Sequence, residues 1–310
     1  MQEKRNKRLL ILLIALICIT GVALWVKRAD QKEIIPKDLF RHFDLQTVNE
    51  IRLESRSGKV TLEYNGTRWK VNGEHYADPA MIEVLFATIQ QTVPKRPVAT
   101  AVQDSVRKAL ENNGVKVSVL SAGSTVESFY AGGNDSKSQA YFVEAETGTP
   151  FLVNIPGYRV YVSGIFELTE SGWRDKRIFT LNWRNFEALQ AQFPNKPADD
   201  FKIELVDKFI SIPGMTEVDT TQINNFMDNL LSLTAEEFVP RVPVLDSLSK
   251  QVPIISIAVK DVAGKLYKLS VYPPIKKTGK IYGLVNEKEW ALFARERLSG
   301  VVRPRKSFGK

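Results

Sequence analysis

An uninterrupted apolar run near the N-terminus limits where the rest of this 310-residue chain can fold. Leu9–Val26 carries no charged residue, and as a helix rising about 1.5 Å per residue it would span roughly 27 Å, close to the hydrocarbon core of a bilayer. Four basic residues lie in the preceding residues 1–8, and such flanks stay in the cytoplasm. The sequence therefore predicts a retained single-pass anchor in the inner membrane, binding lipid through Leu9–Val26, with the bulk of the chain in the periplasm.

Two other uses of this run remain open. A cleaved signal peptide would need small residues at its cleavage site, and Gly21-Val22-Ala23 meets that need. The run continues to Val26, however, and is longer than the ~7–15 apolar residues usual in such peptides. A lipid anchor would need a small residue before Cys18, where Ile17 stands. All three uses place the rest of the chain beyond the membrane.

The net charge of +8 is concentrated at the two ends of the chain. Residues 1–38 hold eight basic and four acidic side chains, and residues 295–310 hold six basic and one acidic. The long stretch between them is nearly neutral, whereas a nucleic-acid-binding domain concentrates basic charge on its folded body. The distribution predicts no nucleic-acid partner.

Beyond a polar juxtamembrane linker at residues 27–43, one pattern of elements occurs twice, in residues 44–179 and 180–310. Leu45–Glu54 and Leu181–Gln190 share several residue types in the same order, although chance similarity is the alternative explanation. We expect a first α+β repeat unit and a second one with a basic C-terminal tail.

Within each expected unit, short alternating strands come first, then one main helix, then hairpins. The helices are predicted to begin at Asp78 and Asp219, which are good N-cap residues, and to stop before Pro94 and Pro240. The predicted hairpins pair Val115–Leu120 with Val126–Tyr130 and Ile254–Val259 with Leu266–Tyr272. The mixed order of elements predicts an α+β fold in which two similar β-rich units, each with one main helix, follow the transmembrane helix.

Short phrases along residues 44–190 resemble a bacterial family catalogued as domain-of-unknown-function family 4340. The phrases are Trp69-Lys70-Val71, Tyr76-Ala77-Asp78, Gly132-Gly133-Asn134-Asp135, Ile155-Pro156-Gly157-Tyr158 and Trp173-Arg174-Asp175-Lys176-Arg177. The resemblance implies an envelope protein with an N-terminal membrane helix and no established catalytic activity. Related domains occur in auxiliary proteins of gliding-type ABC transporters, which implies a transporter component as partner. It supplies no functional residues.

The residues that would carry catalysis or metal binding are few. The two histidines, His42 and His75, lie in no metal-binding or triad spacing, and the single cysteine, Cys18, lies in the apolar run. We therefore expect no catalytic, cofactor or metal site, although the many carboxylates leave a glycosidase pair open.

Two segments are candidates for binding. The loop Gly132, Gly133, Asn134 and Asp135 is a candidate ligand loop, with a turn between strands as the simpler interpretation. The residues Trp173, Arg174, Lys176 and Arg177 are candidate partner contacts, because Trp and Arg are enriched as interface anchors. The simpler interpretation of that cluster is that Trp173 packs into the junction between the two units while the charges pair or point to water.

The leading hypothesis is a non-enzymatic envelope protein whose exported repeats bind a protein partner. The alternative is a module that binds a glycan or a peptidoglycan fragment. Six aromatic residues could line a groove for such a ligand: Tyr64, Trp69, Tyr130, Tyr141, Tyr158 and Trp173.

Overall fold

The computed structural model describes residues 12–22, 38–41, 44–145, 148–206, 209–240, 242–276 and 278–309. Contacts divide the chain into unit 1, residues 1–63 and 83–167, and unit 2, residues 64–82 and 168–310. His42 lies outside the described residues, as does most of the linker expected at residues 27–43.

The apolar N-terminal segment is described only in part. Residues 12–22 form a helix, in which the Thr20 hydroxyl donates a hydrogen bond of 2.7 Å to the Leu16 carbonyl. The other residues of the predicted span Leu9–Val26 lie outside the described part of the chain. No helix among the described residues has the length and apolar character to cross a membrane.

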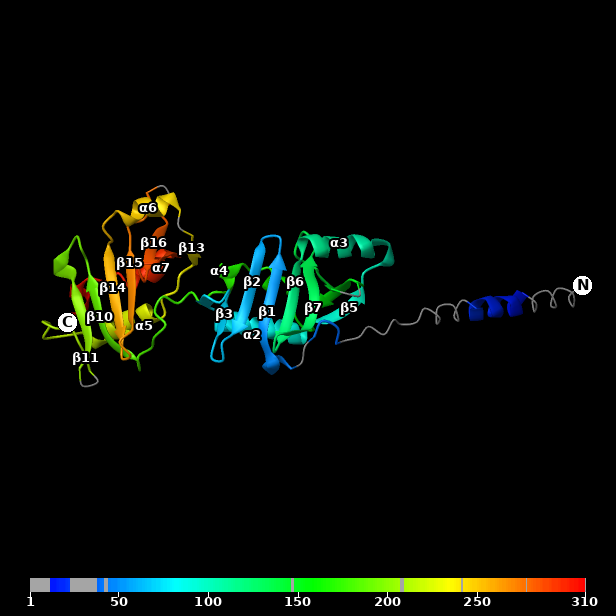
Figure 1. The fold of residues 1–310 in the computed structure, drawn as a ribbon, viewed down its shortest axis with the longest axis horizontal. Helices are drawn as coiled ribbons and strands as arrows, with labels where there is room; N and C mark the ends of the chain where they lie inside the picture. The colour runs from blue at the N-terminus through cyan, green and yellow to red at the C-terminus, as the bar shows by residue number, and fades with distance from the viewer. Residues whose placement is uncertain are drawn as a thin grey trace, which may run out of the picture. The chain divides into compact units, whose positions relative to one another are not determined.

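The first sheet has nine strands in the order β4-β3-β2-β1-β6-β7-β8-β9-β5 (Figure 1). The strands are β1 (Val48–Ser55), β2 (Gly58–Tyr64), β3 (Trp69–Val71), β4 (His75–Tyr76), β5 (Val93–Pro97), β6 (Val115–Ser121), β7 (Ser124–Gly133), β8 (Ala140–Glu144) and β9 (Phe151–Asn154). The helices α2 (Pro79–Gln91) and α3 (Gln103–Asn113) and the 3-10 turn η3 (Val162–Ile165) accompany it. Helix α2 starts after Asp78 as predicted, but it ends at Gln91, and Pro94 lies in edge strand β5.

Aromatic rings fill the interior of unit 1. Phe129 and Phe142 stack with their ring centroids 4.8 Å apart, and Phe40 and Phe166 meet both of them edge to face. Such packing holds the middle of β7 and β8 rigid next to the segment that carries the candidate ligand loop.

The second sheet has eight strands in the order β12-β11-β10-β14-β15-β16-β17-β13. The strands are β10 (Phe186–Gln192), β11 (Phe201–Val206), β12 (Phe209–Ser211), β13 (Glu237–Val239), β14 (Ile255–Asp261), β15 (Leu266–Val271), β16 (Ile281–Val285) and β17 (Glu289–Phe293). Its helices are α4 (Glu170–Trp173), α5 (Thr220–Leu231), α6 (Pro243–Ser249) and α7 (Arg295–Ser299).

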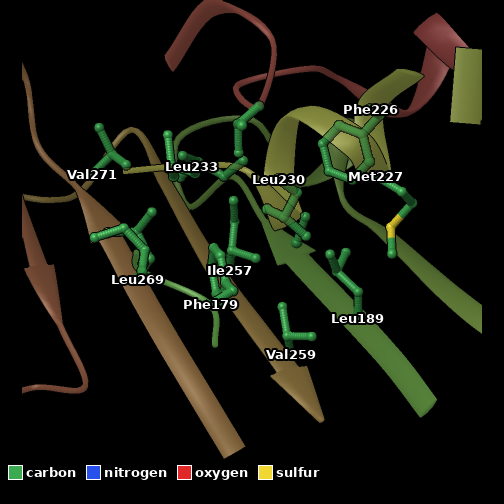
Figure 2. Close-up of a cluster of buried hydrophobic side chains, with 14 of the residues drawn as sticks. Phe179, Leu189, Phe226, Met227, Leu230, Leu233, Ile257, Val259, Leu269 and Val271 are labelled. Atoms are coloured by element: carbon green, nitrogen blue, oxygen red, sulfur yellow. The ribbon is translucent and has the colours of Figure 1, made fainter. Parts of the chain in front are cut away.

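Helix α5 covers the core of unit 2. Asp219 caps it, because its carboxylate accepts hydrogen bonds from the backbone N–H groups of Thr221 and Gln222. Figure 2 shows Phe226, Met227 and Leu230 of this helix facing side chains of β10, β14 and β15, in a cluster that is almost wholly buried. Helix α5 therefore buries one apolar face against the sheet.

The protein is an α+β protein with two antiparallel sheets, and the two sheets repeat one order of elements. In chain order, β1, β2, β3, α2, β5, α3 and β6–β9 correspond to β10, β11, β12, α5, β13, α6 and β14–β17. The first strand of each series also has a bulge against its neighbour, between Val48 and Glu50 in β1 and between Phe186 and Ala188 in β10.

The positions of these bulges align the two halves of the chain differently from the sequence comparison. They align Val48 with Phe186, two residues away from the match of Leu45–Glu54 with Leu181–Gln190. A shift by two residues keeps every side chain on its own face of the sheet, so the apolar alternation looks equally good in both registers. The predicted boundary between residues 179 and 180 stays a prediction.

Candidate functional site

An opening of about 590 Å³ lies in unit 1, where the end of β7 passes helix α3. Its volume falls within the roughly 300–1,000 Å³ usual for small-ligand pockets. It is lined by Val106, Ala109, Leu110, Asn113, Gly114, Gly132, Gly133, Asn134, Asp135, Lys137, Tyr141 and Glu167. All four residues of the predicted ligand loop are among them. We call this the glycine opening.

Gly132 and Gly133 line the glycine opening at the end of β7. Both are paired strand residues, opposite Tyr141 and Ala140 on β8, so they are not part of the turn expected from the sequence. A Cβ at Gly132 would lie 2.7 Å from Leu110 Cδ2 of α3, and a Cβ at Gly133 would collide with the Tyr161 ring. The two glycines therefore let a helix and an aromatic ring approach the strand end closely.

Asn134 builds the turn that follows. Its side-chain oxygen accepts hydrogen bonds from the backbone N–H groups of Ser138 and Gln139, both at 3.0 Å. Its side-chain NH₂ group donates to the hydroxyls of Ser136 and Ser138, at 2.9 and 3.0 Å. These four bonds match two donors and two acceptor positions, which is the full capacity of an amide side chain. The turn is thus fixed, and the Asn134 amide is fully engaged within it.

A charged pair borders the glycine opening. The Lys137 ammonium lies 2.7 and 2.8 Å from the two carboxylate oxygens of Glu167, and the Tyr161 hydroxyl donates a 2.6 Å hydrogen bond to Glu167 Oε1. Burial and then the hydrogen bond to Glu167 raise the pKa of Tyr161 above its ordinary value. Tyr161 therefore stays protonated and acts as a fixed donor, which does not suit it to be a nucleophile or base.

The glycine opening thus combines an apolar wall with a charged, internally paired rim. Val106, Ala109 and Leu110 form the wall on α3. No pattern in the sequence indicates Tyr161, Lys137 or Glu167 as site residues, because they become neighbours only through the fold.

At the corresponding place in unit 2, aromatic side chains occupy the space. Tyr272 follows β15 there, and its N–H donates to the Tyr282 carbonyl on β16. Its ring lies 5.1 Å from that of Trp290, in a buried cluster with Leu245 and Leu248 of α6. The space next to α6 is filled by the protein's own side chains.

The second predicted contact segment lies mostly inside unit 2. Trp173 is fully buried, and its indole N–H has no hydrogen-bond partner among the described residues. Arg174 donates to both carboxylate oxygens of Glu289, at 3.0 and 3.1 Å, and its guanidinium lies 4.1 Å from the centre of the Phe238 ring. Lys176 is half-buried. Trp173 thus packs in the interior, and Arg174 is paired with Glu289.

Arg177 is exposed but is not an independent charge. It donates hydrogen bonds to Asp175, which also accepts one from Arg68 at 3.0 Å. Burial alone would raise the pKa of Asp175, but the hydrogen bonds from Arg177 and Arg68 outweigh it and lower the pKa. The carboxylate thus stays charged and ties the segment to the β3–β4 hairpin of the same unit.

The aromatic residues predicted to line one groove are dispersed. Only Tyr141 lines the glycine opening. Tyr64 and Trp69 contact each other with ring centroids 5.6 Å apart, and Tyr158 is exposed on a turn. His75 lies 3.6 Å from Glu170, yet the described residues contain no group of three or more side chains suited to hold a metal ion.

Two antiparallel sheets with one order of elements make this chain an internally repeated α+β protein. The family described as "Domain of unknown function (DUF4340)" matches residues 69–251, more than half of the chain. The chain belongs to this family. No curated protein matches it.

Proposed function

We propose that this chain is a non-enzymatic binding protein of the bacterial cell envelope that holds a protein partner at the glycine opening of unit 1. The observation that carries the proposal is the opening itself, which has a ligand-sized volume, an apolar wall and a rim fixed by its own hydrogen bonds. A preorganised site of this kind binds without first ordering its own loops.

The polar rim supports a protein partner over a glycan. A sugar is recognised through many hydrogen bonds, but the Asn134 amide already makes four within its own turn, and Lys137 is paired with Glu167. The surface that remains open to a ligand includes the apolar side chains Val106, Ala109 and Leu110 of α3. The glycan-fragment alternative is therefore the less favoured reading of this site.

The proposed location follows from the sequence. The apolar run Leu9–Val26 and the basic residues before it support an inner-membrane anchor with the folded part in the periplasm. The family resemblance supports an ABC-transporter component as the partner. Protease added to intact spheroplasts should remove the C-terminal part; protection of that part would contradict the proposed orientation.

The binding proposal is tested by site-specific crosslinking in cells. A photoreactive amino acid at Asn113, an exposed position that lines the glycine opening, should capture one envelope protein reproducibly. The same amino acid at Val262, exposed on a hairpin turn of unit 2, is the matched control. The capture should disappear in Gly132→Tyr, which adds a ring at the lining of the opening and displaces Leu110. Equal capture at both positions, or capture unaffected by Gly132→Tyr, would contradict the proposal.

A further inference from the structure

Unit 2 has a tyrosine at the position that corresponds to Gly132 of unit 1. Leu53 pairs with Val117 in unit 1 and Ala191 pairs with Ile257 in unit 2, each five residues after the aligned Val48 or Phe186, so Val117 and Ile257 are equivalent. Phe129, opposite Val117, and Leu269, opposite Ile257, are therefore equivalent as well. Counting three residues further along each strand leads to Gly132 and to Tyr272. One position in the repeated fold is therefore glycine in unit 1 and tyrosine in unit 2.

The surroundings of Tyr272 show how such a ring is held. It is about 6% exposed, packs in one cluster with Leu245 and Leu248, and contacts the Trp290 ring. Burial raises the pKa of its hydroxyl, so the phenol stays neutral. The corresponding helix α3 offers Val106, Ala109 and Leu110 to the same space in unit 1.

We propose that the glycine opening takes the side chain of a tyrosine presented by the protein partner. The ring would lie against the apolar wall of α3 next to Leu110, and the phenol hydroxyl would lie at the polar rim. This inference rests on the proposed function and adds the chemistry of the contact. Tyrosine is among the residues most enriched at the centres of protein interfaces.

The charges at the rim favour a neutral ring over a charged group. A carboxylate ligand would meet Asp135 and Glu167, and an ammonium ligand would compete with Lys137 for Glu167. Entry of either would leave one charge poorly paired in a partly buried place, which costs free energy. A phenol needs only one hydrogen bond at the rim and buries its ring on the apolar wall.

The test uses the full chain in lipid nanodiscs, with N-acetyl-tyrosinamide as the probe and ligand-detected NMR as the measurement. A ligand of this size in a preformed opening should bind with a Kd of about 1 mM. Binding should weaken at least tenfold in Gly132→Tyr and stay unchanged in Val262→Tyr, which adds the same side chain at an exposed turn. The difference between the two variants removes any contribution from probe that partitions into lipid.

Gly132→Tyr requires Leu110 to rotate away, so a second variant guards against failure to fold. Ala109→Trp lies on the exposed side of α3, borders the same opening and leaves the strand untouched. It should also abolish probe binding while the melting temperature stays within a few degrees of wild type. Equal probe binding by wild type and both variants would overturn the inference, as would stronger binding of a peptidoglycan disaccharide than of the tyrosine probe.

Failure of this inference is distinguishable from failure of the proposed function. If crosslinking at Asn113 captures a partner but the tyrosine probe does not bind, the opening is a partner site of different chemistry. If neither is seen, both proposals are wrong.

Discussion

Helix α3 in unit 1 and helix α6 in unit 2 hold the same place in the repeated order of elements, but the spaces beside them differ. The space beside α6 is closed by Tyr272 and Trp290, whereas the space beside α3 is bordered by Gly132 and Gly133 and holds an opening of about 590 Å³. The protein's own side chains therefore fill this space in unit 2, whereas the equivalent space in unit 1 stays partly open.

This difference suggests that the cluster in unit 2 stabilises the fold and the opening in unit 1 binds a partner. A closed apolar cluster stabilises the fold, because ring and leucine surface leaves water. An opening lined by glycine gives up that stabilisation, and a bound partner can supply it. Equivalent substitutions should therefore lower the free energy of unfolding more in unit 2 than in unit 1.

The largest effect is expected from Tyr272→Ala. Removing a buried aromatic ring typically lowers the free energy of unfolding by about 3–5 kcal/mol, because contacts are lost and a cavity is left. Chemical denaturation of the full chain measures this loss. The variant should regain about 1 kcal/mol in 10 mM p-cresol, since a ligand that binds only the folded state adds stability. A variant as stable as wild type would show that the Tyr272 cluster does not close unit 2.

The next effect compares two leucines. Leu245 in α6 lies in the closed cluster, and Leu110 in α3 borders the glycine opening. Leu245→Ala should cost about 3–4 kcal/mol and Leu110→Ala about 2 kcal/mol, because truncation beside an opening enlarges an existing space and truncation in a closed cluster leaves a new void. Both are measured by urea unfolding. Equal losses would contradict the difference between the two sites, and a larger loss for Leu110→Ala would reverse it.

A third comparison concerns position 127 and its counterpart. Glu127 pairs with Val119 in unit 1, and Tyr267 pairs with Val259 in unit 2, so a carboxyl group in one unit corresponds to a buried ring in the other. Burial and then the nearby charge of Glu144 raise the pKa of Glu127 from its ordinary value near 4.5 to about 7. The folded protein therefore binds this proton more tightly than the unfolded chain.

The sign of the resulting pH dependence follows directly. Stability from Glu127 is highest below pH 4.5, falls as the pH rises towards 7 and is level above that. Glu127→Gln should therefore stabilise the protein by about 1 kcal/mol at pH 8, after allowance for solvent screening of this half-buried group, and change little at pH 4.5. Thermal unfolding of the variant and of wild type from pH 4.5 to 8 measures this difference in stability. A constant difference between variant and wild type across that range would exclude the titration of Glu127.

Much of the fold was readable from the sequence, because its signals are local. Asp78 and Asp219 mark helix starts, and alternation of apolar residues marks the hairpins of β6–β7 and β14–β15. The register of the repeat was not readable, because a shift by two residues preserves the alternation and only the bulges in β1 and β10 reveal it.

From the sequence, the candidate site can be predicted only as a loop. The glycines and polar residues of Gly132–Asp135 indicate a ligand loop. The other residues that line the opening, such as Leu110 and Glu167, are distant in sequence and cannot be predicted from it. Trp173 shows the opposite case, since its type suggested an interface and its position is fully buried. An aromatic residue next to charges does not by itself tell an interior anchor from a surface one.

The smallest expected effect sharpens the comparison at the two main helices. The Asp219 carboxylate accepts two backbone N–H groups at the start of α5, from Thr221 at 2.9 Å and Gln222 at 3.1 Å. Asp78 accepts one at the start of α2, from Ala80 at 2.9 Å. Asp219→Ala should lower the free energy of unfolding by about 1 kcal/mol and Asp78→Ala by roughly half as much, because fewer backbone donors lose their partner. Urea unfolding of both variants, with Asp→Asn at each position as the control that keeps a capping oxygen, measures this difference. A larger loss at Asp78 would show that the number of backbone donors bound by the capping carboxylate does not set its contribution to stability.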